Sequence, residues 1–126
     1  MTEGELAPFE YAVLRVVPRA DRGEFVNVGV VLYCQQRDFL AARTHLYAER
    51  LRALDPAADV DAIRTALSAW EATCTGAGEA AGMRPGERFR WLAAPRSTVL
   101  RAGPVHMGLA ADPGTELDRL TTLLVH

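Results

Sequence analysis

The chain has 126 residues, a length that suits one domain able to fold without disulfides or metals. Its hydrophobic fraction of 49% and charged fraction of 24% are ordinary for a globular protein and argue against disorder of the whole chain. The formal net charge of −2 argues against a general nucleic-acid binder, which needs a basic surface. Each basic residue is arginine, a composition that coding bias in a GC-rich genome explains.

No targeting, membrane or metal signal stands out. Residues 1–8 are short, acidic and lack the apolar core of a signal peptide, and no apolar run approaches the ~18 residues of a membrane span. Cys34 and Cys74 belong to no Cys/His cluster, so neither a zinc site nor a redox motif is indicated. We therefore expect a cytoplasmic protein without metal or cofactor, with a flexible segment over 1–8 and one domain over 9–126.

Three strands are expected in the first third of the chain. Residues 9–18 alternate with Tyr11, Val13 and Arg15 on one face, and both faces are largely apolar, which predicts a central strand covered twice. Turn residues ending at Gly23 lead to a second strand over 24–34, and a third follows over 39–46. Short polar turns imply antiparallel pairing, so the three strands form a meander.

The middle and the end of the chain contain helical patterns. A first helix is predicted over 47–54 and a second after the capping residue Asp59, with an apolar stripe from Val60 to Cys74. Residues 75–87 are rich in glycine and predict a mobile surface loop. Strand-like patterning returns over 88–92 and 98–109, and the Asp112–Pro113 pair starts a last helix. The predicted class is α+β, an antiparallel sheet that begins with a three-strand meander and is covered by two or three helices.

Asn27 and Gly29 are unusual choices for the middle of a strand. A buried amide left unpaired costs about 1–3 kcal/mol, so Asn27 is either hydrogen-bonded within the fold or faces a binding groove. Gly29 fits a bulge or a close approach of another backbone. If the hairpin pairs near residues 15 and 27, Arg15 lies opposite Asn27, and an ion pair of Arg15, with Glu24 the nearby carboxylate, is the structural alternative to a binding role.

Two further candidates lie in the second half of the chain. Arg96, Ser97 and Thr98 follow a proline and could offer a guanidinium, hydroxyls and backbone amides to a phosphate or carboxylate, although the same residues suit a plain turn. His106 lies between Pro104 and Gly108, and no serine or cysteine nucleophile motif accompanies it. His45 and His126 are interpreted as surface residues.

Five segments together resemble the DUF3037 family, a bacterial domain of unknown function common in actinobacteria. They are Tyr11–Arg19, Glu24–Val30, Arg88–Leu92, Ala94–Thr98 and Pro104–His106. The resemblance spans nearly the whole chain and implies no established activity. Genes of this family often lie beside one for a HipA-like protein with a kinase fold, which implies an accessory or partner role. The family's recurring residues map to Arg15, Arg19, Glu24, Asn27, Gly29, Arg96, Ser97, Thr98 and His106.

Three hypotheses about function follow. The first is a non-enzymatic accessory module that binds a partner protein, with the HipA-like kinase-fold protein as candidate. The second is a small enzyme or ligand-binding domain that holds an anionic, phosphate-bearing substrate in one groove formed by Arg15, Asn27, Arg96, Ser97 and His106. The third is a structural domain that forms a homodimer through an exposed sheet edge.

Overall fold

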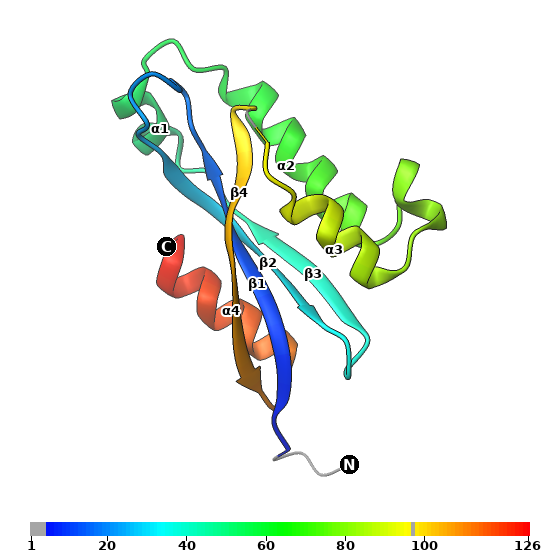
Figure 1. Ribbon diagram of the computed structural model, residues 1–126. Helices are drawn as coiled ribbons and strands as arrows, with labels where there is room; N and C mark the ends of the chain where they lie inside the picture. Colours follow the sequence, from blue (N-terminus) through cyan, green and yellow to red (C-terminus); the bar gives the residue numbers. More distant parts are fainter. Residues whose placement is uncertain (1–4, 97) are drawn as a thin grey trace.

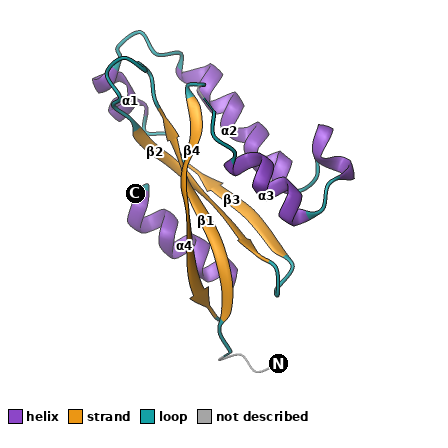
Figure 2. Cartoon of the chain, viewed as in Figure 1, coloured by secondary structure: helices purple, strands orange, loops and turns teal. Residues whose placement is uncertain are grey.

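The computed structural model describes residues 5–96 and 98–126, and its elements form an α+β fold (Figures 1 and 2). Four strands form a single sheet, and helices lie on both of its faces. The strands are β1 (Ala7–Val16), β2 (Val26–Cys34), β3 (Phe39–Thr44) and β4 (Leu100–Ala110). The helices are α1 (Ala48–Leu54), α2 (Val60–Cys74), the 3₁₀-helix η1 (Gly78–Gly82), α3 (Pro85–Ala93) and α4 (Pro113–Leu124).

All strand pairs in the sheet are antiparallel, and the strand order is β3-β2-β1-β4. The predicted meander of three strands is therefore confirmed. The last strand returns to pair with the first, which makes β1 central and leaves β4 at an edge. β1 begins at Ala7, two residues earlier than predicted, and Ala7 pairs with Ala110. The first four residues of the predicted flexible segment lie outside the described part of the chain.

The sheet has a separate hydrophobic core on each face. On one face α2 and α3 cover side chains such as Leu14 and Val31, and Phe89 of α3 is fully buried among them. On the other face α4 inserts Leu117 and Leu120 against Phe9, Val30 and Leu32. The two helical layers lie on opposite sides of the strands in Figure 1. Among the described helices, none combines the length and the apolar character that crossing a membrane would require.

A bulge in β2 divides its side chains between the two cores. Leu14 pairs with Gly29 and Arg15 pairs with Asn27, so Val28 is an extra residue on the β2 side. Val28 belongs to the core under α2, whereas Val30 belongs to the core under α4. Strict alternation along β2 would place both valines on one face, but the bulge shifts the period and separates them.

Three predicted helices are confirmed with nearly the expected bounds. Asp59 caps α2, where its carboxylate accepts from the Ala62 N–H at 3.0 Å. Asp112 caps α4 in the same way by accepting from the Gly114 N–H at 3.1 Å. Gly23 adopts a φ of 69° in the turn between β1 and β2, a conformation that glycine tolerates without strain.

The strand predicted over 88–92 is wrong, because these residues belong to α3. Pro85 occupies the first turn, and Glu87 accepts a hydrogen bond from the Arg84 N–H at 3.2 Å, which closes the helix start. Phe89 and Leu92 are three residues apart and both buried, a helical spacing that the alternation of arginine with aromatic residues masks. The loop predicted over 75–87 is also shorter than expected, since η1 and the start of α3 occupy much of it.

Candidate functional site

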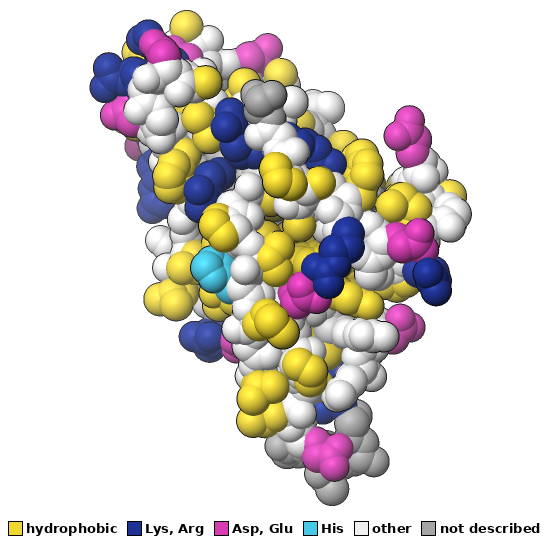
Figure 3. Space-filling view, in the orientation of Figure 1, with side chains coloured by type: hydrophobic (Ala, Val, Ile, Leu, Met, Phe, Trp, Pro, Cys, Tyr) yellow, Lys and Arg dark blue, Asp and Glu magenta, His cyan; other side chains and the backbone are white. Residues whose placement is uncertain are grey.

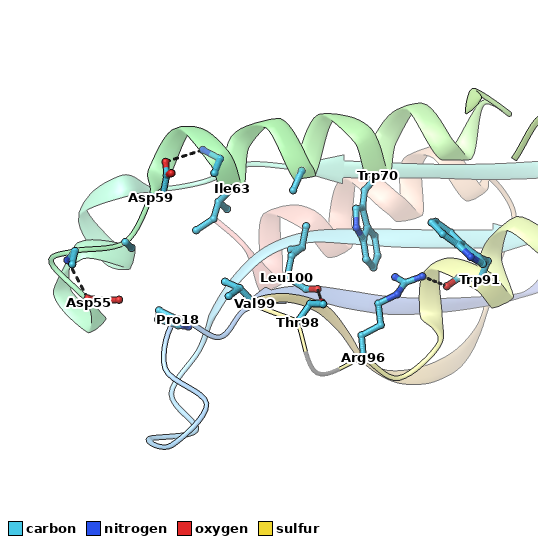
Figure 4. Close-up of a pocket in the computed structure, with 14 residues that line it drawn as sticks. Pro18, Asp55, Asp59, Ile63, Trp70, Trp91, Arg96, Thr98, Val99 and Leu100 are labelled. Carbon is cyan, nitrogen blue, oxygen red and sulfur yellow. Dashed lines mark hydrogen bonds between the residues drawn. The ribbon is translucent and has the colours of Figure 1, made fainter. Parts of the chain in front are cut away.

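A groove of about 630 Å³ lies between α2 and the segment that leads into β4 (Figure 4). One wall is lined by Ala62 and Ala66, four residues apart on α2, and by Ala58 just before this helix. Such small side chains leave room above the helix. The opposite wall includes Val99, which is 47% exposed, and Leu100. The groove is therefore mainly apolar, as ligand and peptide sites commonly are.

Arg96 lies at one end of the groove between two tryptophans. Its guanidinium carbon is 5.3 Å from the Trp70 ring centre and 4.6 Å from that of Trp91, both within cation–π range. Arg96 Nη2 donates to the Trp91 carbonyl at 2.6 Å and Nη1 to the Leu92 carbonyl at 3.4 Å. Arg96 thus satisfies carbonyls at the C-terminal end of α3, where a positive charge is favourable.

The groups predicted to bind an anion at 96–98 make hydrogen bonds to the backbone where they are described. Thr98 Oγ1 donates to the Leu100 carbonyl at 2.8 Å, and Arg96 donates to carbonyls of α3. Ser97 lies outside the described residues. Of the two described members, both use side-chain donors on the backbone, which fits the turn interpretation.

The groove carries opposite charges at its two ends. Asp55 and Asp59 lie at the end near the α2 N-terminus, and Arg96 lies at the other (Figure 4). Asp55 Oδ1 accepts from the Ala57 N–H at 3.0 Å, so the first carboxylate is fixed by the local turn. A partner segment with apolar residues between a basic and an acidic end would match this distribution.

Arg15 and Asn27 lie on the other face of the sheet, directly opposite each other as predicted. Asn27 Nδ2 donates to the Leu124 carbonyl at 3.1 Å, near the end of α4. The hypothesis that Asn27 is hydrogen-bonded within the fold is thus confirmed for its amide nitrogen. Its Oδ1 is buried and makes no hydrogen bond among the described residues.

The contacts of Glu24 and Gly29 indicate structural roles for both residues. Glu24 pairs with Arg22 in the turn between β1 and β2, rather than with Arg15. This hydrogen bond from Arg22 lowers the pKa of the Glu24 carboxyl below its ordinary value. A Cβ atom at Gly29 would lie 2.7 Å from the Arg43 carbonyl oxygen, so the predicted close backbone approach is present.

His106 is an exposed residue on β4 and lies beside Tyr11, with 5.2 Å between the ring centres. It lies on the same face of the sheet as Arg15. Its pairing partner on β1, Tyr11, is four residues from Arg15, which is about 13 Å at the usual strand rise. Arg96 packs against α2 and α3, whereas Asn27 contacts α4, so these two side chains lie on opposite faces of the sheet. The single groove expected to unite Arg15, Asn27, Arg96 and His106 is not formed.

Sequence reasoning missed a cluster of rings near the end of α4. Tyr47 Oη and His126 Nδ1 are 2.6 Å apart, and the His45 ring centre is 4.3 Å from that of Tyr47. Arg50 lies over the Tyr47 ring at 4.1 Å and donates to the Val125 carbonyl at 2.8 Å. The two histidines are exposed, as predicted. Their proximity has no local signal, because Tyr47 and His126 are 79 positions apart.

The described residues provide little for covalent or metal chemistry. They contain no group of three or more histidine, cysteine, aspartate or glutamate side chains placed to hold a metal ion. Cys74 is buried, and burial raises the pKa of its thiol to about 11, which disfavours the reactive thiolate. Cys34 is also a buried free thiol.

Residues 11–125 match the family model described as "Protein of unknown function (DUF3037)". No curated protein and no solved structure matches the chain. The family match covers every helix and most of the sheet described above. The chain therefore belongs to the DUF3037 family.

Proposed function

We propose that this domain is a non-enzymatic accessory module of the bacterial cytoplasm that binds a partner protein. The observation that carries the proposal is where exposed apolar side chains gather. Of the eight large hydrophobic residues that are exposed in the described part of the chain, five lie within residues 91–109. They are Trp91, Val99, Val105, Met107 and Leu109.

These five side chains, together with the groove, define what we call the β4 face. Val105, Met107 and Leu109 alternate along the edge strand and lie on the α3 side of the sheet, where Met107 is 76% exposed. Figure 3 shows hydrophobic side chains along the lower half of β4. Exposed apolar patches of this kind mark protein interaction sites, and an aromatic side chain such as Trp91 is a common anchor.

The family resemblance supplies a candidate partner, the HipA-like kinase-fold protein. Its binding segment would place apolar residues in the groove, an acidic group near Arg96 and a basic group near Asp55 and Asp59. The free backbone groups of β4 offer an added strand-pairing surface at the same edge.

Co-expression with the kinase-fold neighbour followed by size-exclusion chromatography tests the proposal. We expect the two chains to elute together at micromolar concentration. Met107→Arg and Trp91→Ala should each weaken the complex at least about tenfold, the usual effect of losing a central apolar anchor. Leu123→Arg is the matched control, because Leu123 is 67% exposed on α4, away from this face. Separate elution of the wild-type chains, or equal weakening by all three variants, would overturn the proposal.

Self-association through β4 is a second candidate, favoured by the composition of the strand. Residues 102–111 contain no arginine, aspartate or glutamate, so two copies can meet in antiparallel fashion without like-charge repulsion. Multi-angle light scattering of the isolated chain should then give twice the monomer mass, and Met107→Arg should restore the monomer. A wild-type chain that stays monomeric up to about 100 µM, well above an ordinary micromolar dissociation constant, would rule this candidate out.

A further inference from the structure

Two arginines lie directly opposite each other on the sheet face that carries α4. Arg15 of β1 pairs with Arg101 of β4, and Asn27 of β2 lies on the other side of Arg15. Like charges at opposed positions of neighbouring strands destabilise a sheet. In the described chain neither arginine has a carboxylate within ion-pair distance, although arginines elsewhere do, such as Arg90 with Glu10 at 2.6 Å.

Arg15 is held in place without being neutralised. Its guanidinium carbon lies 4.1 Å from the centre of the Phe25 ring, and a Cβ atom at Gly103 would be only 2.6 Å from Arg15 Nη2. The absence of a side chain at Gly103 therefore provides the room that the guanidinium occupies. Arg15 Nε is buried and makes no hydrogen bond to any described residue. Phe25 and Gly103 thus fix the cation by packing and leave its charge uncompensated.

Arg101 is held by a hydrogen bond to the backbone. Its Nε donates to the Thr98 carbonyl at 2.8 Å, whereas its terminal nitrogens make no hydrogen bond within the described part of the chain. The core residues under α4, such as Phe9 and Leu32, belong to the other half of this face. Basic side chains gather around the start of β4 in the space-filling view (Figure 3).

We propose that Arg15 and Arg101 form a binding site for a phosphate or diphosphate group. Two planar guanidinium forks can each donate paired hydrogen bonds to phosphate oxygens, and a doubly charged anion would remove the repulsion between them. Preorganisation by Phe25 and Gly103 lowers the entropic cost of binding. This site goes beyond partner binding by the β4 face, since it lies on the opposite face of the sheet.

Titration of the ¹⁵N-labelled protein with inorganic pyrophosphate at constant ionic strength tests the site. We expect saturable shifts of the Arg15 and Arg101 side-chain Nε–H resonances, together with a rise of about 2 °C or more in the melting temperature at 10 mM ligand. The same titration with inorganic phosphate separates a preference for diphosphate from binding of a single phosphate group. A saturable response to either anion supports the site.

Variants assign the binding to the two arginines. Arg101→Gln and Arg15→Lys should each weaken pyrophosphate binding at least tenfold, the lysine variant because it keeps the charge but loses the fork. Arg64→Gln is the matched control, since Arg64 is exposed on α2 and makes no hydrogen bond among the described residues. The proposal fails if the wild type gives no saturable shift up to 10 mM, or if Arg64→Gln weakens binding as much as Arg101→Gln. Circular dichroism confirms that each variant is folded.

Discussion

Gly29 and Asn27 illustrate how single residues adapt the sheet to its two cores. At Gly29 the backbone of β3 comes so close that a Cβ atom would lie 2.7 Å from the Arg43 oxygen and 2.9 Å from Thr44 Cγ2. At Asn27 the bulge turns the amide toward the last turn of α4. Both residues are poor strand formers, and both are required here by neighbours distant in sequence.

Gly29→Ala should lower the free energy of unfolding by about 1–3 kcal/mol, because the added methyl group meets backbone that cannot move away cheaply. Urea denaturation measures the change. Gly82→Ala is the control, since a Cβ atom there meets nothing within 4 Å and should leave stability unchanged or slightly higher. Equal effects of the two substitutions would contradict the close approach at Gly29.

Asn27→Ala should cost about 1–2 kcal/mol, since the Leu124 carbonyl loses its hydrogen-bond donor. Thermal denaturation reports the loss, with Gln36→Ala as control for removal of an exposed amide. The sequence shows that Asn27 is an unusual residue for a strand. It does not identify the hydrogen-bond partner, because Leu124 is 97 positions away. A stability equal to that of the control variant would show that this hydrogen bond contributes nothing.

At the scale of elements, capping residues explain why two helices begin where the sequence predicts. Asp59 and Asp112 each precede a clear apolar stripe, and α2 and α4 begin where these residues indicate. The error at α3 came from Arg88–Leu92, where a five-residue alternation is too short to distinguish a strand from a helix with Phe89 and Leu92 buried. Tertiary contacts decide such a segment: as a helix, it buries both Phe89 and Leu92 in the core on the face covered by α2 and α3.

The cap of α4 predicts a dependence of stability on pH. The hydrogen bond from Thr115 Oγ1, followed by that from the Gly114 N–H, lowers the pKa of the Asp112 carboxyl below its ordinary value. The unfolded chain therefore binds this proton at higher pH than the folded one. The stability that this group provides is present above about pH 4, the unfolded pKa, and is lost as the pH falls further.

Asp112→Asn should keep the cap, since asparagine caps as well as aspartate, and should reduce the loss of melting temperature between pH 5 and pH 3. Asp61→Asn is the control, because Asp61 is exposed and makes no hydrogen bond among the described residues. Parallel melting curves for wild type and Asp112→Asn across this range would refute the role of the carboxylate.

The reactivity of the Cys74 thiol reports how tightly α2 packs in the fold. Because burial raises the pKa of the Cys74 thiol to about 11, little thiolate forms at pH 8. Cys74 in the native protein should react with a disulfide reagent at least about a hundredfold more slowly than in urea, and Cys34→Ser isolates its signal. Rapid native reaction would show that α2 opens readily.

At the scale of the whole molecule, the sheet separates two surfaces. The β4 face presents apolar side chains and the groove, and the opposite face presents the Arg15–Arg101 pair beside α4. The sequence predicted the α+β class and the central position of β1, because these depend on local periodicity. It could not predict which candidates share a face, since that depends on the return of β4 to β1 and on the bulge at Val28.

Amide hydrogen exchange on the complex with the proposed kinase-fold partner tests the central proposal, that the β4 face binds a protein. We predict slower exchange within residues 91–109 on complex formation, and unchanged exchange in β3 and α4. Protection confined to β3 or α4, or no protection within 91–109, would contradict the account.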